Sequence, residues 1–76
     1  MRVRVTVMLK DGVLDPQGEA VRHALGAMGF DGVEGVRQGK VIELDVSDDV
    51  TDANIGEMCE SLLANTVIED YVIERS

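Results

Sequence analysis

The chain has 76 residues, a formal net charge of −8, one cysteine and one histidine. A chain of this length forms a single domain and buries only about 60% of the surface that it exposes when unfolded. One cysteine and one histidine exclude a disulfide framework or a structural zinc site as a further source of stability. We therefore expect one domain over residues 1–76 that is stabilised by binding to itself or to another protein.

The charge and hydropathy of this chain argue against a membrane protein and against a nucleic-acid-binding protein. No run of 18 apolar residues is present, and the N-terminus alternates arginine and valine where a secretory signal would be continuously apolar. A single cysteine is typical of a reducing compartment, so we expect a cytoplasmic protein. Residues 41–76 hold ten acidic residues and one basic residue, and this charge would repel a phosphate backbone.

The first two predicted elements are a strand and a helix joined by a short loop. Between Val3 and Leu9, valine or leucine occupies every second position, which predicts a strand with one face on a core. Asp15 precedes Pro16, and this pair is typical of a helix N-terminus because the carboxylate can accept from an unpaired amide while proline lacks one. The expected helix covers about residues 16–28 and ends where Gly29 can adopt a left-handed conformation.

A hairpin is expected next in the chain. Residues 33–37 and 40–46 are extended runs separated by Gln38 and Gly39, which favour a turn. With a two-residue loop, Arg37 would face Lys40, and like charges at such positions destabilise a hairpin. The pair therefore suggests an anionic partner, and the alternative is that both are solvated charges at a turn.

A second helix and a last strand complete the predicted fold. The helix is expected to begin near Asp49 or Thr51 and to end at Asn65 and Thr66, and residues 67–75 form the last strand. The order β-α-β-β-α-β predicts an α+β, ferredoxin-like fold in which an antiparallel sheet carries both helices on one face. The apolar residues at helical spacing are Ile55, Met58, Cys59, Leu62 and Leu63.

The two helices would leave the other face of the sheet uncovered. We expect this outer face, or an edge strand, to form a homodimer, with arginines of the first strand beside acidic residues of the strand at 40–46. The expected core-side residues after the first helix are Val33, Ile42, Leu44 and Val46. The expected outer-face residues are Arg2, Arg4, Thr6, Met8, Glu34, Val36, Val41, Glu43 and Asp45.

Three groups of residues could carry chemistry, and a structural role explains each of them better. Cys59 lies on the apolar stripe without a second cysteine, as a buried and inert thiol does. His23 lies off the core face of the first helix and has no nucleophile to activate. Asp48, Asp49 and Asp52 lack the glycine and glutamate of a calcium loop and suit the start of a helix.

Five blocks of this sequence resemble the small PurS-type subunit of phosphoribosylformylglycinamidine synthase, the glutamine-dependent enzyme of purine biosynthesis. The blocks span nearly the whole chain in the right order and spacing, and one departure is Thr66, where the family commonly has proline. The blocks are Leu9-Lys10-x-Gly12-Val13-Leu14-Asp15-Pro16-Gln17-Gly18, Ala24-Leu25 to Gly29-Phe30, Val36-Arg37-x-Gly39-Lys40-x-Ile42-Glu43-Leu44, Met58-Cys59-Glu60 to Leu62-Leu63-Ala64-Asn65, and Val67-Ile68-Glu69-Asp70-Tyr71.

The resemblance implies a non-catalytic subunit of an ATP- and glutamine-dependent ligase complex. Proteins that look like this form a dimer, or a dimer of dimers, that joins a glutaminase subunit to a synthetase subunit. Ammonia released by the first converts formylglycinamide ribonucleotide (FGAR) into the amidine (FGAM) on the second. ATP and magnesium are used by the synthetase partner, so we expect no catalytic residue, cofactor or metal in this chain. The expected partner contacts are Asp15, Gln17, Arg37 and Lys40.

Two other functions stay open on the sequence alone. A ferredoxin-like dimer could sense an amino acid or a nucleotide held between its subunits, with the glycine-rich residues 32–39 lining the site. An autonomous enzyme is the least favoured interpretation, because no motif supplies partners for His23 or Cys59.

Overall fold

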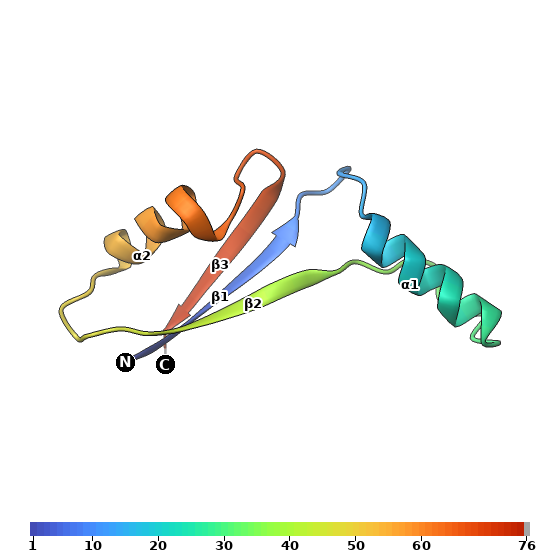
Figure 1. The fold of residues 1–76 in the computed structure, drawn as a ribbon, viewed down its shortest axis with the longest axis horizontal. Helices are drawn as coiled ribbons and strands as arrows, with labels where there is room; N and C mark the ends of the chain where they lie inside the picture. The colour runs from blue at the N-terminus through green and yellow to red at the C-terminus, as the bar shows by residue number, and fades with distance from the viewer. Residues whose placement is uncertain (76) are drawn as a thin grey trace.

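The computed structural model describes residues 1–75 and contains a three-stranded antiparallel sheet with two helices (Figure 1). Strand β1 lies in the centre of the sheet, and β2 and β3 pair with it antiparallel on either side. The α+β class and the antiparallel sheet are therefore confirmed. The elements are β1 (Arg2–Leu9), α1 (Pro16–Ala27), β2 (Gly39–Asp45), α2 (Asp52–Met58), the π-helical turn η1 (Cys59–Leu63) that continues α2, and β3 (Glu69–Arg75).

The alternation of β1 builds the core. Its valines Val3, Val5 and Val7 are buried against Ile55 of α2 and Cys59 of η1. Neighbouring side chains close the rim of this core, and they include the expected core-side residues of the strand at 40–46. The partly buried members are Ile42, Leu44, Val46, Val50, Leu63, Tyr71 and Ile73. The prediction was wrong for Val33, which lies outside this cluster.

The outer face of the sheet carries the expected mixture of charges. Arg2 of β1 forms ion pairs with Glu43 at 3.3 Å and Asp45 at 3.5 Å on β2. The register places Thr6 beside Val41, so the side chains expected outside on these two strands do share one face. The expectation that Glu34 and Val36 would join them was wrong, because residues 33–37 form no strand in this structure.

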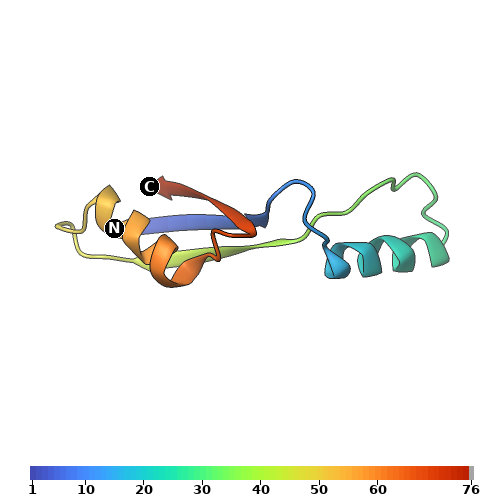
Figure 2. The ribbon, with the colours of Figure 1, turned by 90° about the horizontal axis from the view of Figure 1, so that it is seen from above.

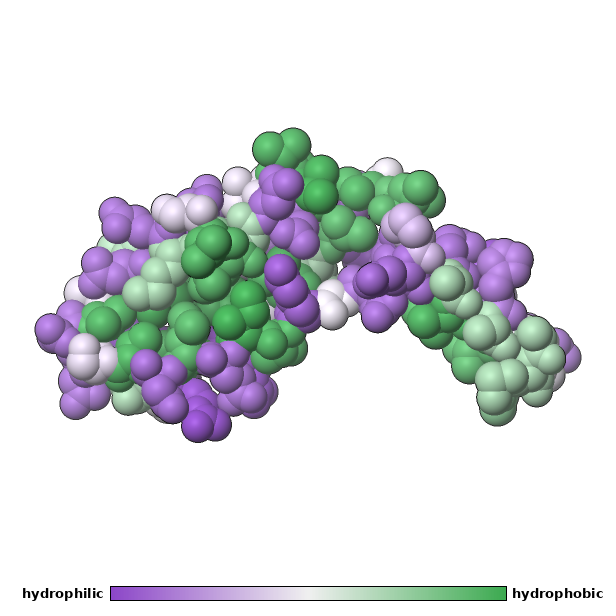
Figure 3. Space-filling model, viewed as in Figure 1, coloured by the Kyte–Doolittle hydropathy of each residue, from purple (hydrophilic) through white to green (hydrophobic). Residues whose placement is uncertain are grey.

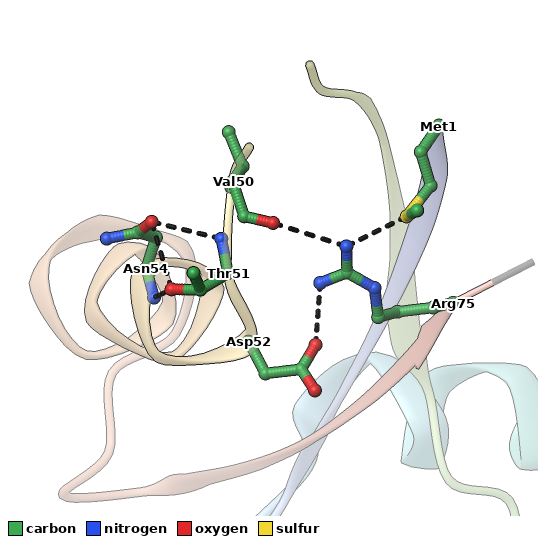
Figure 4. Close-up of polar contacts among 6 residues, drawn as sticks. All are labelled: Met1, Val50, Thr51, Asp52, Asn54 and Arg75. Carbon is green, nitrogen blue, oxygen red and sulfur yellow. Dashed lines mark hydrogen bonds and ion pairs between the residues drawn. The ribbon is translucent and has the colours of Figure 1, made fainter. Parts of the chain in front are cut away.

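The second helix begins at the later of the two expected positions. Thr51 and Asn54 form a reciprocal cap at the start of α2 (Figure 4). The backbone N–H of Asn54 donates to Thr51 Oγ1 at 3.2 Å, and the backbone N–H of Thr51 donates to Asn54 Oδ1 at 3.0 Å. Arg75 at the end of β3 donates to Asp52 at 2.6 Å and to the Val50 carbonyl at 3.2 Å. These bonds fix the start of α2 against the last strand.

The first helix has the predicted bounds but not the predicted place. Its C-terminal end is as expected: Gly29 has φ +96°, and the Phe30 amide donates to the Leu25 carbonyl at 3.0 Å. However, α1 projects beyond the end of the sheet (Figures 1 and 2), and Gly18 is its only buried residue. The expectation of two helices on one face of the sheet was therefore wrong.

The physical reason is that the chain does not turn back at Gln38. The Gln38 amide donates to the carboxylate of Asp15, and Arg37 donates to the Leu9 carbonyl, so both residues are held by the loop that follows β1. A hairpin at this point would break both interactions. Residues 10–38, hereafter the arm, therefore form one long excursion between two strands that pair directly with each other.

Substitutions in the core should destabilise the protein more than substitutions at exposed positions. Ile55→Ala removes a fully buried side chain and should lower the free energy of unfolding by about 2–5 kcal/mol. Val67→Ala, at a side chain that is 82% exposed, should change it by less than about 0.5 kcal/mol. Urea unfolding of both variants at one protein concentration tests this, and equal losses would contradict the assigned core.

Candidate protein-interaction site

The base of the arm is organised by the carboxylate of Asp15. One oxygen accepts from the Gly18 amide at 2.9 Å, which caps α1, and the other accepts from the Gln38 amide at 2.8 Å. These two backbone bonds, with Gln38 the stronger influence, lower the pKa of Asp15 below its ordinary value, and the nearby guanidinium of Arg37 acts in the same direction. One side chain thus holds the start of α1 to the end of the arm.

Arg37 also acts within the chain. Its guanidinium donates to the Leu9 carbonyl and forms an ion pair with Asp11 at 3.4 Å. Because Asp11 is almost fully exposed, this ion pair adds little, and the bond to the backbone is the more specific interaction. Arg37 therefore adds a second link between the two ends of the arm, and the like-charged pairing with Lys40 across a hairpin does not occur.

Gln17 and Lys40 lie at the same junction, but bonds within the described residues do not occupy their side chains. Within residues 1–75 their side chains make no hydrogen bond or ion pair, and with Asp15 they line a hollow of about 210 Å³ beside Glu69. Small-molecule sites are usually about 300–1,000 Å³. The four residues expected to contact partners are thus brought to one place, and the surface there suits a protein better than a metabolite.

Gly18 also shapes this junction, and the sequence analysis did not predict that role. A Cβ atom at this position would lie 2.4 Å from the carbonyl oxygen of Val36 and 2.8 Å from the carboxylate of Asp15. Glycine therefore lets the returning half of the arm pack against the first turn of α1. The signal was the glycine inside a helical pattern, which often marks a close approach of backbone.

The side chains that could act in catalysis or bind a metal lie apart from one another. Cys59 is fully buried, so the prediction of a core cysteine is confirmed, and desolvation raises the pKa of its thiol. His23 is exposed on α1. Asp49 accepts from Ser47 Oγ at 2.6 Å, whereas Asp52 pairs with Arg75.

Residues 1–75 contain no group of three or more histidine, cysteine or acidic side chains placed to hold a metal ion. No helix in the same residues is long and apolar enough to cross a membrane.

The Asp15 interaction predicts a pH dependence. Because the pKa of Asp15 is lowered in the folded state from 3.8, its stabilising effect is present at neutral pH and is lost as the pH falls through the lowered value. Asp15→Ala should speed hydrogen exchange of the Gln38 amide on the order of tenfold, and Asp15→Asn, which keeps an oxygen acceptor, by less. Asp11→Asn is the matched control, and an unchanged Gln38 amide in Asp15→Ala would contradict this role.

The comparisons with known proteins agree along the whole chain. The family model PurS, described as phosphoribosylformylglycinamidine (FGAM) synthase, matches residues 2–76. The PurS subunit of Mycobacterium leprae FGAM synthase is 53% identical over 74 residues, which cover 97% of this chain and 94% of that protein.

Solved structures show the same similarity. The crystal structure of Bacillus subtilis PurS has a TM-score of 0.88 and 56% identity, covering 96% of this chain and 94% of that one. A chain of the Thermotoga maritima PurLQS structure has a TM-score of 0.80 and 28% identity, covering 96% and 93%. Sequence and structure together show that this chain belongs to the PurS family of FGAM synthase subunits.

Proposed function

We propose that this chain is the small, non-catalytic subunit of an FGAM synthase complex and that it acts as a homodimer bridging a glutaminase subunit and an ATP-dependent synthetase subunit. The complex converts FGAR, ATP, glutamine and water into FGAM, ADP, phosphate and glutamate. The observation that carries this proposal is the match over nearly the full length of the chain to PurS proteins, one of them in a PurLQS structure.

The separation of the potentially reactive side chains supports a non-catalytic role. Covalent catalysis needs a nucleophile beside a base, and the Cys59 thiol is buried with a raised pKa while His23 is exposed on the arm. ATP chemistry needs a magnesium site, and no suitable cluster lies within residues 1–75. ATP, magnesium and the glutaminase nucleophile therefore belong to the larger subunits in this proposal.

A bridging subunit has a clear physical purpose in such a reaction. Ammonia that escapes into bulk water is protonated and diluted, and ammonium is no nucleophile. Holding the glutaminase and the synthetase in a fixed relation shortens the path between the two active sites and raises the effective concentration of ammonia at the second.

Gln17 and Lys40 are the residues at the junction that are best suited to contact a larger subunit. Asp15 and Arg37 are occupied by bonds within the chain, whereas Gln17 and Lys40 present unused donors beside them. Asp15 and Arg37 would then position this surface, and Gln17 and Lys40 would touch the partner.

Reconstitution from purified subunits tests the proposed function. Leaving this chain out should reduce glutamine-dependent formation of FGAM to the background rate and leave a substantial ammonia-dependent rate, because the synthetase retains its own active site. The measurement is the rate of FGAM formation with each nitrogen source. Undiminished synthesis from glutamine without this chain would overturn the proposal.

Lys40→Gln tests the contact at the junction. The variant should weaken binding to the larger subunits by up to about fivefold, since an exposed charge contributes up to about 1 kcal/mol, and it should leave the unfolding free energy unchanged. Lys10→Gln is the matched control, because the Lys10 ammonium already pairs with Asp70 at 2.9 Å. Calorimetric titration gives both affinities, and equal effects of the two substitutions would remove the special role of Lys40.

A further inference from the structure

Two loops at one end of the sheet expose large apolar side chains. Leu14, in the loop between β1 and α1, is 75% exposed, and Val67, in the loop between η1 and β3, is 82% exposed. Ile68 beside it is 39% exposed. Figure 3 shows hydrophobic side chains gathered over these two loops at the upper end of the sheet. The three residues are hereafter the end patch.

Hydrogen bonds hold both loops in place. The Lys10 amide donates to the Ile68 carbonyl at 2.8 Å, which joins one loop to the other. The Asn65 carbonyl accepts from the Ile68 amide at 3.0 Å, and the Asn65 side chain accepts from the Val67 amide at 3.2 Å. Gly12, with φ +85°, turns the first loop. The end patch therefore stands on a fixed backbone, which lowers the conformational entropy lost when a partner binds.

The end patch has no part in the core of this chain. Leu14, Val67 and Ile68 all lie outside the hydrophobic cluster that β1 builds with α2 and η1. Single exposed apolar side chains are common on protein surfaces, whereas a group of them with a polar rim is typical of a protein-interaction site. The two ordered loops therefore expose apolar surface that the fold itself does not use.

An acidic hollow lies next to the end patch. Its volume is about 310 Å³, and its lining residues are Lys10, Glu60, Thr66, Glu69, Asp70 and Tyr71. The Lys10 ammonium pairs with Asp70 at 2.9 Å, so these two charges compensate each other. Within residues 1–75, Glu60 and Glu69 form no ion pair with a basic side chain. The hollow therefore keeps a net negative charge.

Both uncompensated carboxylates are held in position. Glu69 accepts from the Asn65 amide at 2.6 Å. The hydroxyl of Tyr71 donates to Glu60, and this hydrogen bond raises the pKa of Tyr71. No three acidic side chains of residues 1–75 are placed to hold a metal ion. The hollow therefore suits the guanidinium or ammonium group of a basic side chain, which forms charge-assisted hydrogen bonds with carboxylates.

We propose that the end patch and the acidic hollow together dock a larger subunit of the FGAM synthase complex. The docking segment of that subunit lays an apolar side chain on Leu14 and Val67 and places an arginine or lysine beside Glu60 and Glu69. This inference rests on the proposed function, and it adds a second contact surface and the chemistry of the partner segment.

Charge argues against a second copy of this chain as the occupant. The chain has a net charge of −8, and residues 41–76, which supply most of the acidic hollow, hold ten acidic residues and one basic residue. Two end patches that faced each other would bring like-charged carboxylates together. A small molecule is also disfavoured, because Leu14 and Val67 stand out from loops whereas metabolites bind in concave sites.

The acidic hollow adjoins the junction at the base of the arm. Glu69 lines both the acidic hollow and the hollow that contains Gln17 and Lys40. A subunit that covers both places must present a basic group to Glu60 and Glu69 and an acceptor to Lys40. Such an alternation of charge fixes the orientation of a partner and rejects partners with the wrong pattern.

Substitution of Val67 tests the apolar contact. In the reconstituted complex, Val67→Asp should raise the concentration of this chain needed for half-maximal glutamine-dependent FGAM formation by about tenfold or more. Val67→Ile keeps the apolar surface and is the matched control, which should need the same concentration as the original chain. Because Val67 lies outside the core, circular dichroism should show that both variants are folded. An unchanged requirement in Val67→Asp would overturn the docking.

Substitution of Glu69 tests the acidic hollow. Glu69→Gln keeps an oxygen that can accept from the Asn65 amide, and it should raise the required concentration by up to about fivefold at low salt and by less at high salt. Asp48→Asn removes a charge that is 94% exposed at the opposite end of the sheet and is the control. Equal effects of the two substitutions would exclude the acidic hollow from the contact.

Photo-crosslinking identifies the occupant directly. A benzophenone amino acid in place of Leu14 should crosslink this chain to the glutaminase or the synthetase subunit when the three proteins are mixed and irradiated. A crosslink only to a second copy of this chain, or none at all, would overturn the docking. A crosslink to a larger subunit without any glutamine-dependent synthesis would refute the proposed function alone. Full synthesis with Val67→Asp and no such crosslink would refute the docking alone.

Discussion

The two hydrogen bonds accepted by the carboxylate of Asp15 determine the shape of this subunit. One starts α1 and the other holds Gln38, so the helix and the end of the arm leave the sheet from the same point. With its base fixed, α1 has no route to the core of its own chain. The exposed helix and the open groove beside α2 both follow from this one local arrangement.

The parts of the fold that depend on local chemistry could be predicted from the sequence. The alternation that ends at Leu9, the caps at Asp15 and Thr51, and the left-handed Gly29 all lie where the residue types favour them. The π-helical turn after Met58 could not be foreseen, because helical spacing of apolar residues does not distinguish a π turn from the α-helix that it continues.

The hairpin failed as a prediction for a different reason. The pattern of residues 33–46 fits a turn at Gln38, but alternation alone does not show whether the two runs pair with each other. What prevents the hairpin is a bond between residues 23 positions apart, Asp15 and Gln38, and no local pattern contains that information. The site residues show the same limit: the resemblance selected Asp15 and Arg37 as partner contacts, and the structure uses both within the chain.

The two faces of the sheet differ in what covers them. The core side packs against α2 and η1, whereas the outer face carries arginine and carboxylate pairs and a row of Val41, Thr6 and Val72 across the three strands. Val41 and Val72 are 56% and 59% exposed, so a strip rimmed by charge lies open on this face. A chain of 76 residues can therefore present a docking surface without enclosing an active site.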